Sequence, residues 1–446
     1  MISNYIKLAL RVLGRKKFFT VISLFGISFT LGILMVILSF LQSEFGNSRP
    51  MSNKDDMILV ERLRLQTVFY DTLTTVDTIV SSDGIVYDTT YDYEKRGTMM
   101  WNSSINNGIG EDYLQDMETI ENLTIFNDGG LYDIYVNGVK QTFATMYSDP
   151  EYFEVFDHKI IEGRAMDEND FQKARQVVVM STKAAQNYFG RTSNVVGEEM
   201  EIDEKMYKVI GLYPHNGRVR EFVSPHLVLP YTLLNEEDQT SFYHGSFSVI
   251  LQKQSSVDVQ VAKEELKERA DKIPMDHPTK PEGYNELLLN GETYDEMIAS
   301  GVMYLDDSEK SYRYLKYILL FLLSFFIVLP TLNLINLNVS RIMDRSSEIG
   351  VRKAFGAHQG NILGQFVVEN IIQTIIGGAI GLGLAVALIN LINKGGALGE
   401  SSLSLSPKFF LWSLIITLIF GVISGALPAY RMSKLQIVSA LKNNKL

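Results

Sequence analysis

The stretch FFTVISLFGISFTLGILMVILSFL, from Phe18 to Leu41, holds 24 residues and no charged side chain. A helix needs about 20 apolar residues to cross the hydrocarbon layer of a bilayer. The stretch is too long for the apolar core of a signal peptide, and no small-x-small cleavage site follows it. We therefore predict that residues 18–41 form an uncleaved transmembrane helix.

Three further stretches have the same character. Residues 317–340, 371–392 and 409–430 carry no Lys, Arg, Asp or Glu and are each at least 22 residues long. Buried helices of soluble proteins rarely run so long without a charge. We predict an α-helical membrane protein with four transmembrane helices, one plus three, at residues 18–41, 317–340, 360–392 and 409–430.

The charges are distributed unevenly around these helices. Residues 1–17, 341–358 and 431–446 carry 13 basic and two acidic residues, whereas residues 43–316 carry 26 basic and 48 acidic residues. Positive flanks stay on the cytoplasmic side. Both termini are therefore expected in the cytoplasm, residues 1–17 as an amphipathic interfacial helix or a plain basic flank and 431–446 as a tail. Residues 43–312 and the short loop 393–408 are expected outside. The whole-chain charge of −11 hides this segregation.

The inserted region 43–312 is predicted to be a large α+β domain, in two lobes. Strands are expected at 57–66, 123–127, 131–136, 176–180, 200–203, 207–212 and 247–252, and helices at 110–122, 182–189 and 257–272. Residues 71–92 are expected to form strands joined by Ser81-Ser82-Asp83-Gly84. Asn137-Gly138 is a strong signal for a two-residue hairpin turn.

No pattern of catalytic residues is found in the sequence. It has no Cys, no G-x-x-x-x-G-K-[ST] loop, no G-x-S-x-G and no H-E-x-x-H, and its six His have no ligand-like spacing. We expect no catalytic residue, no metal site and no cofactor on this chain. The acidic balance argues against a nucleic-acid partner.

Small residues mark the third predicted span. Gly377, Gly378, Gly381 and Gly383 give the small-xxx-small spacing that lets transmembrane helices approach closely. We predict a packing face, either within the helix bundle or between two chains. Glu369 is the one ionisable residue in this span.

Two sets of residues resemble known families. One is Glu162-Gly163-Arg164, Asp170, Val177-Val178-Val179-Met180-Ser181, Phe189-Gly190 and Val209-Ile210-Gly211, similar to the periplasmic core domain of MacB-type ABC transporter permeases. The other is Arg345-Ser346-Ser347-Glu348-Ile349-Gly350-Val351-Arg352-Lys353-Ala354-Phe355-Gly356, with the ending Leu427-Pro428-Ala429-Tyr430-Arg431, which looks like the FtsX-type permease domain. Gln436 and Ile437 stand where family members often have Asp-Pro.

The resemblance implies a permease subunit that moves its external domain when a separate cytoplasmic ATPase binds and hydrolyses ATP with Mg²⁺, which is called mechanotransmission. It also implies a second permease chain, identical or not, and a bacterial inner membrane location with a periplasmic domain. The coupling segment, residues 341–358, is expected to dock on the ATPase through Arg345, Glu348, Ile349, Gly350, Val351, Arg352, Lys353, Phe355 and Gly356. Without the resemblance, the residues favour the plainer reading that this segment is only a basic loop on the cytoplasmic side.

Other functions remain open at this point. The chain could drive export or transfer of a substrate, as an efflux permease. It could instead resemble FtsX in regulating external cell-wall hydrolases, or release lipoproteins. The corresponding external partners are a periplasmic adaptor, a hydrolase or a lipoprotein. An enzyme domain on a membrane stalk has no support in the sequence.

Overall fold

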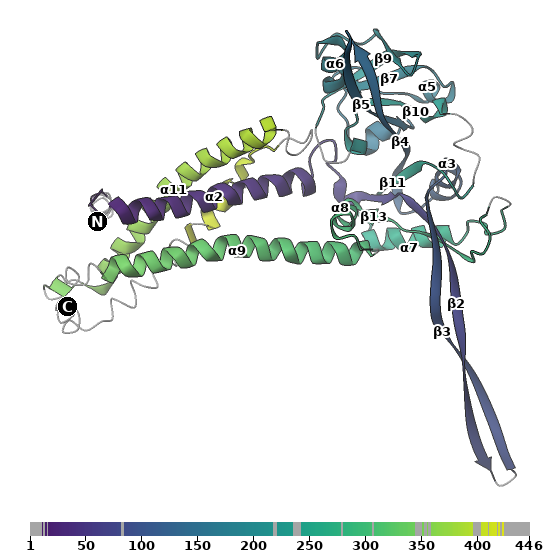
Figure 1. The fold of residues 1–446 in the computed structure, drawn as a ribbon, viewed down its shortest axis with the longest axis horizontal. Coiled ribbons are helices and arrows are strands. Elements are labelled where there is room, and N and C mark those ends of the chain that lie inside the picture. The colour runs from purple at the N-terminus through teal and green to yellow at the C-terminus, as the bar shows by residue number, and fades with distance from the viewer. Residues whose placement is uncertain are drawn as a thin grey trace. The chain divides into compact units, whose positions relative to one another are not determined.

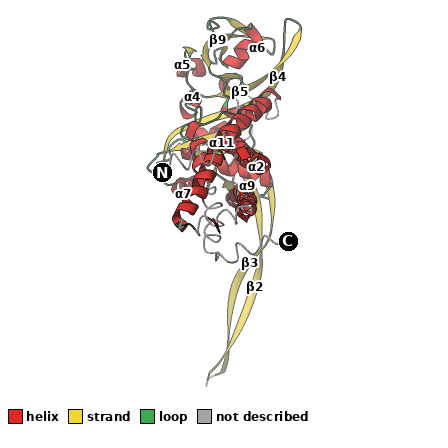
Figure 2. Ribbon diagram, turned by 90° about the vertical axis from the view of Figure 1, so that its left-hand side faces the viewer, coloured by secondary structure: helices red, strands yellow, loops and turns green. Residues whose placement is uncertain are grey.

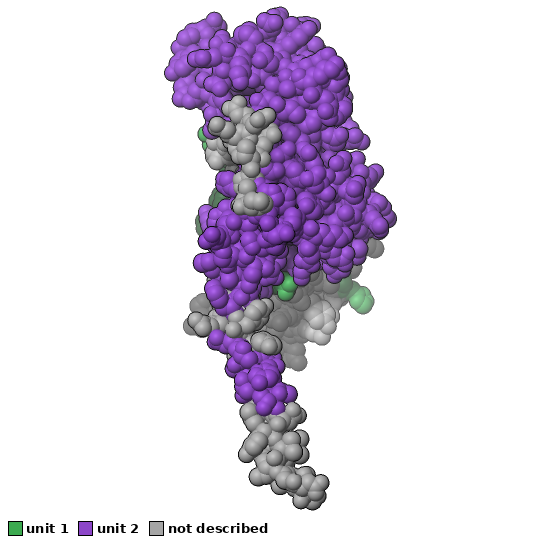
Figure 3. Space-filling view, turned by 90° about the vertical axis from the view of Figure 1, so that its right-hand side faces the viewer, with its two compact units in different colours: residues 1–46, 313–446 green, residues 47–312 purple. Residues whose placement is uncertain are grey.

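The computed structural model describes residues 11, 14–15, 17–81, 84–216, 221–234, 242–277, 280–305, 307–343, 350–351, 355, 358–395, 403–408, 410–416, 418–419 and 422. The chain divides into two compact units. Unit 1 comprises residues 1–46 and 313–446, and unit 2 comprises residues 47–312 (Figure 3). Most of the predicted flanks 1–17 and 431–446 and part of the loop 393–408 lie outside the described residues.

Unit 1 is built from long apolar helices. They are α2 (Lys17–Phe45), most of α9 (Ser308–Met343) and α11 (Gln359–Gly395) (Figure 1). Among the described residues, three helical segments are long and apolar enough to cross a membrane: Lys17–Phe45, Ser308–Val328 and Gly364–Gly395. The fourth predicted span, 409–430, lies largely outside the described residues. It therefore stays a prediction.

In its described part, unit 2 contains a mixed ten-stranded sheet with the order β13-β1-β11-β4-β5-β10-β7-β9-β6 and with β8 paired to β9. The β10–β5 and β7–β9 pairs are parallel and the others antiparallel. The strands are β1 (Met57–Val60), β4 (Ile120–Val136), β5 (Val139–Ser148), β6 (Glu162–Gly163), β7 (Val177–Ser181), β8 (Glu199–Ile202), β9 (Lys205–Tyr213), β10 (Leu227–Pro230), β11 (Phe247–Lys253) and β13 (Glu292–Thr293).

Both faces of this sheet are buried, because successive side chains of a strand point to opposite faces. On β11, Val249 and Leu251 belong to one apolar cluster and Ile250 to another. In the part of unit 2 that the structure describes, five short α-helices and one π-helical turn accompany the sheet: α3 (Asn107–Ile109), the turn η2 (Gly110–Leu114), α4 (Tyr152–Val155), α5 (Glu168–Gln172), α6 (Thr182–Phe189) and α8 (Tyr294–Met303). The longer α7 (Val259–Ala270) contributes Ala262 and Leu266 to the first cluster. Three 3₁₀ turns are η1 (Lys54–Asp56), η3 (Glu221–Val223) and η4 (Tyr231–Leu233).

A second sheet of unit 2, three-stranded in the described residues, has the order β12-β2-β3 and contains a long hairpin. Strand β12 is Glu286–Leu289, β2 is Arg62–Ser81 and β3 is Gly84–Ser104. β12 pairs with β2 only over residues 63–66. Beyond that point, β2 and β3 continue as a two-stranded ribbon that extends away from the ten-stranded sheet (Figures 1 and 2).

The chain enters and leaves unit 2 at the same edge of the ten-stranded sheet. β1, the first strand of the unit, pairs with β13 through Ile58 and Thr293. β13 leads directly into α8 and then to the first turn of α9. The two segments that connect unit 2 to the rest of the chain therefore begin from neighbouring strands.

Several local predictions are confirmed. The helix at 182–189 has the predicted bounds, and β4 and β5 are joined by the expected hairpin at Asn137-Gly138. Both turn residues have positive φ, 52° and 77°, as a type I′ turn requires. Ser181 accepts a hydrogen bond from the Ala184 N–H at 3.2 Å and so caps the helix at its N-terminus.

Three local predictions were wrong. The helix expected over 110–122 is only the short turn to Leu114, and strand β4 begins at Ile120 because it pairs with β11. The separate strands 123–127 and 131–136 are one strand, with a bulge between Asp128 and Gly130. Gly130, at φ 74°, supplies the backbone conformation of this bulge. The strand expected at 57–66 divides at Glu61 between the two sheets.

Candidate functional site

The first turn of α8 carries two carboxylates next to the segments that connect unit 2 to the rest of the chain. Thr293 caps the helix by accepting from the Glu296 N–H, and the Glu296 carboxylate accepts the Thr293 N–H at 2.7 Å. This capping box holds the Glu296 carboxylate at the start of α8. Asp295 lies in the same first turn, so both carboxylates are at the positive end of the helix dipole.

Lys54 binds the first of these carboxylates. It lies in η1, which follows α2 after a short linker, and its Nζ is 2.6 Å from Asp295 Oδ1. The Lys54 side chain is only 3% exposed. The neighbouring Asp56 accepts from Lys253 Nζ at 2.6 Å, which ties the same turn to β11. The segment that enters unit 2 is thus held by two mostly buried ion pairs.

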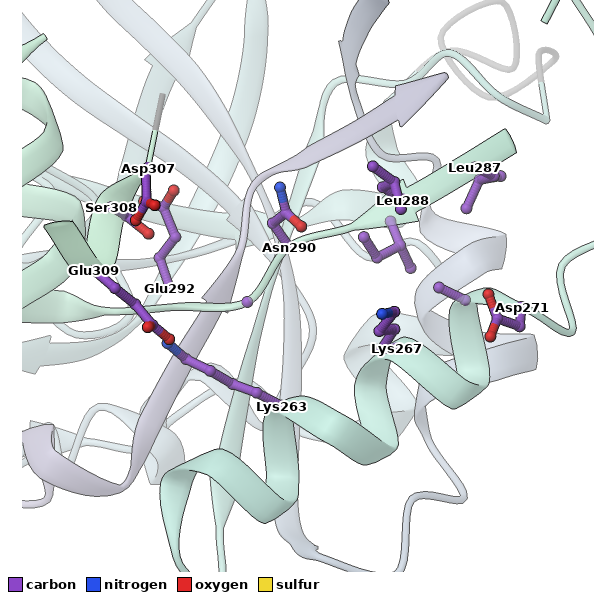
Figure 4. Close-up of a pocket in the computed structure, with 13 residues that line it drawn as sticks. Lys263, Lys267, Asp271, Leu287, Leu288, Asn290, Glu292, Asp307, Ser308 and Glu309 are labelled. Carbon is purple, nitrogen blue, oxygen red and sulfur yellow. The ribbon is translucent and has the colours of Figure 1, made fainter. Parts of the chain in front are cut away.

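Lys263 of α7 binds the second carboxylate and also reaches α9. Its Nζ lies 2.9 and 2.7 Å from the two Glu296 carboxylate oxygens. The same Nζ lies 3.4 Å from Glu309 Oε1 (Figure 4). Glu309 belongs to the first turn of α9, and Gln260 Nε2 is a further 3.4 Å neighbour of it. The segment that leaves unit 2 is thus held through Lys263.

Tyr312 of α9 completes this arrangement. We call the following residues the junction: Lys54, Lys263, Asp295, Glu296, Glu309 and Tyr312. The Tyr312 phenol donates a hydrogen bond to the Asp295 carboxylate. Beside the junction, burial first and then the charges of Glu61 and Glu296 raise the pKa of Glu292. A pocket of about 420 Å³ opens here, with Lys263, Lys267, Glu292 and Glu309 on its wall (Figure 4).

The junction holds its segments together by ion pairs, most of them buried. Removing one partner from a buried ion pair leaves an uncompensated charge and costs several kcal/mol, so such pairs resist separation. Lys54 binds α8 from one connecting segment, and Lys263 links α8 to the other.

The predicted coupling segment falls mostly outside the described residues. Of its nine named residues, Gly350, Val351 and Phe355 are described, and Arg345, Glu348, Ile349, Arg352, Lys353 and Gly356 are not. The Phe355 N–H donates to the Val351 carbonyl at 3.1 Å, an i to i+4 bond typical of a helix. The Phe355 side chain is 88% exposed in the isolated chain.

The four glycines of the third predicted span have different surroundings on α11. Added Cβ atoms would lie 2.6 Å from Ile27 at Gly377 and 2.8 Å from the Ser28 carbonyl oxygen at Gly381. At Gly378 the nearest atom is a Leu414 methyl, 3.1 Å away. At Gly383 nothing lies within 4 Å. Gly377 and Gly381 thus face α2 within one chain, and Gly383 does not.

The buried carboxylate of α11 has a neighbour on its own helix. Glu369 is fully buried and accepts a hydrogen bond from Gln365 Nε2 at 2.8 Å. A one-turn separation places these side chains on the same helix face. The pair therefore shields the carboxylate inside unit 1.

Two motif residues of unit 2, Glu162 and Asp170, hold loops together. Glu162 accepts hydrogen bonds from the backbone N–H groups of residues 194, 195 and 196 at 2.7 to 3.2 Å. Asp170, fully buried, pairs with Arg164 at 2.5 Å and lies 3.4 Å from Arg175. In the described residues, no group of three or more His, Asp and Glu is arranged to hold a metal ion.

Sequence reasoning missed the junction. Lys54 and Asp295 are 241 residues apart, and nothing in the sequence pairs one buried lysine with one acid among many. The spacing Thr293-x-x-Glu296 is a capping-box signature and could have located the start of α8. It could not have revealed which lysines the helix binds.

Two family models match the chain. A model described as a MacB-like periplasmic core domain matches residues 20–269, more than half of the chain. A model described as an FtsX-like permease C-terminal domain matches residues 320–437. The matches follow the order in which the sequence motifs occur.

Curated relatives agree with these domains. An uncharacterized ABC transporter permease, YknZ, of Bacillus subtilis is 28% identical over 316 residues, 70% of each chain. A macrolide export ATP-binding/permease protein, MacB, of Psychrobacter cryohalolentis is 26% identical over 298 residues, 66% of this chain. The match spans 42% of that MacB protein, well under half of its length.

Solved structures resemble parts of the chain more distantly. The periplasmic region of MacB from Actinobacillus actinomycetemcomitans is 18% identical, with a TM-score of 0.34 over 46% of this chain and 86% of that one. A domain of a putative permease from Porphyromonas gingivalis is 13% identical, with a TM-score of 0.37 over 54% of this chain and 91% of the other.

Proposed function

Because this chain belongs to the family of ABC transporter permeases that combine a MacB-like periplasmic core domain with an FtsX-like permease domain, we propose that it couples ATP use by a separate cytoplasmic ATPase to movement of unit 2. In this role, the chain is a non-catalytic permease subunit. The movement drives export or extracytoplasmic transfer of a substrate.

The proposed energy source is a separate ATPase chain. The sequence holds no P-loop, so phosphate-binding backbone and the usual Mg²⁺-binding hydroxyl are absent from it. ATP and Mg²⁺ would bind the partner ATPase. That assignment is consistent with the MacB relatives, which are named for both ATP binding and permease function and extend well beyond the matched region.

The coupling segment is the proposed contact with the ATPase. Phe355 is an exposed aromatic side chain at the end of a helical turn, between segments rich in mixed charge. A short helix with one apolar anchor fits the hydrophobic groove of a partner. Arg345, Glu348 and Arg352 would then contact the polar rim of that groove.

The junction is the observation that carries the proposal. A permease that transmits movement needs its external domain bound firmly to the segments that lead to the membrane helices. Lys54 and Lys263 provide that attachment at α8, in a mostly buried setting where salt screens ion pairs weakly. We propose that the junction passes displacement of these segments to unit 2.

Location and assembly follow from the same premise. We propose a bacterial inner membrane protein with four transmembrane helices, cytoplasmic termini and a periplasmic unit 2. Four helices per chain are few for an ABC membrane unit, which favours two permease chains with two ATPase chains. A native mass measurement in detergent that gave one permease with one ATPase would contradict the dimer.

Co-purification with the cognate ATPase tests the proposal. Phe355→Asp should reduce recovery of the ATPase at least tenfold, because a carboxylate cannot enter an apolar groove without a large desolvation cost. Tyr304→Asp is the matched control, since Tyr304 is 91% exposed but belongs to unit 2. Equal ATPase recovery from both variants would show that the coupling segment is not the docking site.

A further inference from the structure

A second pocket of unit 2 is lined by α8 and by the start of β2. Its volume is about 380 Å³, within the usual range of small-molecule sites, about 300–1,000 Å³. Its wall comes from β1 and β2, from the connection between β12 and β13, and from α8 with the residues after it. We call it the arginine pocket. The charged residues on its wall are Glu61, Arg62, Arg64 and Glu292.

The two arginines are placed to bind one anion together. Arg62 and Arg64 are two residues apart on β2, so their side chains leave the same face of the strand. Arg64 Nε donates to Asn102 Oδ1 at 3.1 Å, which orients its guanidinium. In the part of the chain that the structure describes, neither arginine belongs to an ion pair. Guanidinium groups bind phosphate oxygens through parallel N–H bonds, so a phosphate fits this pair.

Two carboxylates balance these cations. Burial, followed by the charges of Glu61 and Glu296, raises the pKa of Glu292. The charge of Arg62 acts on this pKa in the opposite direction, which places Arg62 and Glu61 both near Glu292. A free phosphate or a purely anionic head group would meet repulsion from these carboxylates. A ligand that carries an ammonium beside its phosphate complements all four charged groups.

The rest of the wall is partly apolar. Leu59 and Met297 line the pocket and are only 7% and 5% exposed, whereas Leu305 lines it and is 42% exposed. Val302 follows a lining residue of α8 and is 55% exposed. The apolar surface thus continues from the pocket to the outside of unit 2. Exposed apolar residues beside a polar site are typical of contact with a membrane or a partner, and here they suit the chains of an amphiphilic ligand.

The chain enters a candidate membrane helix directly after this pocket. Leu305 lies just before Ser308, where the candidate span Ser308–Val328 begins. Tyr314 and Tyr317 of this span are 51% and 62% exposed, and tyrosine is enriched where transmembrane helices pass the lipid head groups. From Ser308 to Tyr317 the helix rises by about 14 Å, since each residue adds about 1.5 Å. Along the chain, the arginine pocket is therefore close to the head groups.

We propose that the arginine pocket binds one phospholipid, from the leaflet on the side of unit 2, whose head group carries both a phosphate and an ammonium. Arg62 and Arg64 bind the phosphate oxygens. Glu61 and Glu292 bind the ammonium, and the acyl chains leave the pocket past Leu305. The bound lipid connects the start of β2 to α8, the helix that carries Asp295 and Glu296 of the junction. This binding requires that α9 enters a membrane, and it does not depend on a partner ATPase.

Photo-crosslinking of the full-length protein in phosphatidylglycerol nanodiscs is the first test. The photoreactive lipid is a phosphatidylethanolamine with a diazirine near the head-group end of one acyl chain. Mass spectrometry should find its adduct on the peptide that contains Leu305. Combining Arg62→Gln with Arg64→Gln should lower the yield of this adduct about tenfold or more, because the charge-assisted bonds to the phosphate are lost.

The matched control combines Arg191→Gln with Lys205→Gln, since both residues are exposed and neither lines the pocket. Its adduct yield should equal that of the wild type. Equal yields from the arginine variant and this control, or adducts confined to peptides of α2, α11 and the apolar part of α9, would overturn the proposal.

Competition identifies the head group. Replacing most of the phosphatidylglycerol with unlabelled phosphatidylethanolamine should lower the adduct yield about tenfold, because only the latter supplies the ammonium that the glutamates bind. Millimolar inorganic phosphate should leave the yield unchanged. Displacement by inorganic phosphate would identify a site for a soluble anion, and equal yields in the two kinds of nanodisc would show that the ammonium is not recognised. Either result contradicts the proposal.

Glu61→Gln combined with Glu292→Gln separates recognition of the two charges of the head group. The arginines remain in this variant, and an anionic head group no longer meets repulsion. Phosphatidylglycerol should then compete as well as phosphatidylethanolamine, so the adduct yield should become equal in the two kinds of nanodisc. A variant that keeps the wild-type preference would show that these glutamates do not bind the ammonium.

A variant that blocks the pocket without removing a charge guards against effects on folding. Ser300 of α8 lines the pocket and is half-buried, so Ser300→Phe places a ring in the space that the head group would occupy. The adduct on the Leu305 peptide should be lost, while the unfolding midpoint of unit 2, followed by fluorescence, stays near that of the wild type. An adduct that survives in a folded Ser300→Phe protein would place the lipid elsewhere.

Discussion

Gly381 of α11 lies against the backbone of α2 so closely that a Cβ added to it would be 2.8 Å from the Ser28 carbonyl oxygen. Ile27, Leu31, Met35 and Ala385 form a buried apolar cluster between the same two helices. The glycine therefore lets the two backbones meet where the surrounding side chains are already packed.

Gly381→Ala should destabilise unit 1 by about 1–3 kcal/mol, because the added methyl group meets a carbonyl that cannot rotate away. Gly383→Ala is the control, since nothing lies within 4 Å of its Cβ position, and alanine favours the helix there by up to about 1 kcal/mol. Thermal unfolding in detergent would measure both. A lower midpoint for Gly383→Ala than for Gly381→Ala would show that the contact with α2 is wrongly placed.

Lys263→Met should destabilise unit 2 by about 3 kcal/mol or more, because it leaves the mostly buried Glu296 carboxylate without its cation. Glu309→Gln removes only the outer contact of Lys263, where Glu309 is 48% exposed, and should cost less than about 1 kcal/mol. Urea unfolding followed by fluorescence of Trp101, in a Trp412→Phe background, reports both values. Equal costs would mean that Glu296 keeps a second cation.

Asp149 makes unit 2 sensitive to pH. Burial raises its pKa to about 8, although Thr124 Oγ1 and the Ile125 N–H donate to the carboxylate at 2.6 and 2.5 Å. The folded state therefore holds a proton that the unfolded chain, with a pKa of 3.8, has released. Consequently, the contribution of Asp149 to the free energy of unfolding should fall as pH rises from about 4 to about 8.

Asp149→Asn should remove that dependence, because the amide oxygen can accept one of the two hydrogen bonds and carries no charge. The measurement is a series of urea unfolding curves between pH 5 and 8 (about the range that the folded and unfolded pKa values bracket). Parallel pH profiles for the variant and wild type would show that another group causes the dependence.

Gly163→Ala tests the motif Glu162-Gly163-Arg164. Gly163 has a φ of 72°, and a Cβ there would collide with the Ile210 carbonyl oxygen. Gly190→Ala is a matched control, because Gly190 has a φ of 71° and an open Cβ position. The control should lose about 1–2 kcal/mol from backbone strain alone, and Gly163→Ala should lose clearly more. Similar losses would mean that the collision is relieved by a shift of β9.

Local signals in the sequence predicted much of this fold. The apolar length of residues 18–41 predicted a membrane helix, and Asn137-Gly138 predicted its turn, because each depends on residues that are neighbours in the chain. Asp128-Gly129-Gly130 has the composition of a turn but forms a bulge, since pairing with β5 and β11 extends the strand on both sides. Here the pairing of β4 with its two neighbouring strands outweighed the local preference of these residues for a turn.

The junction lay beyond sequence reasoning for the same physical reason. Nothing in the local sequence distinguishes the charged residues of the junction from others in the chain. They meet only because the pairing of β1 with β13 brings distant segments together. The glycine face could be predicted from the sequence because one helix carries all four glycines. The sequence could not predict which of them contact α2, because that depends on how α2 packs against α11.

The pairing of β1 with β13 has a consequence for the history of such chains. Because the first and last strands of unit 2 are neighbours, the whole unit is a cassette whose two ends meet. Such a cassette can be inserted, deleted or exchanged as one segment between the helices that flank it, and the strand order of its sheet stays the same. A chimera that carries a relative's cassette on this chain's helices should therefore need only two splice points, one before Lys54 and one after Tyr312.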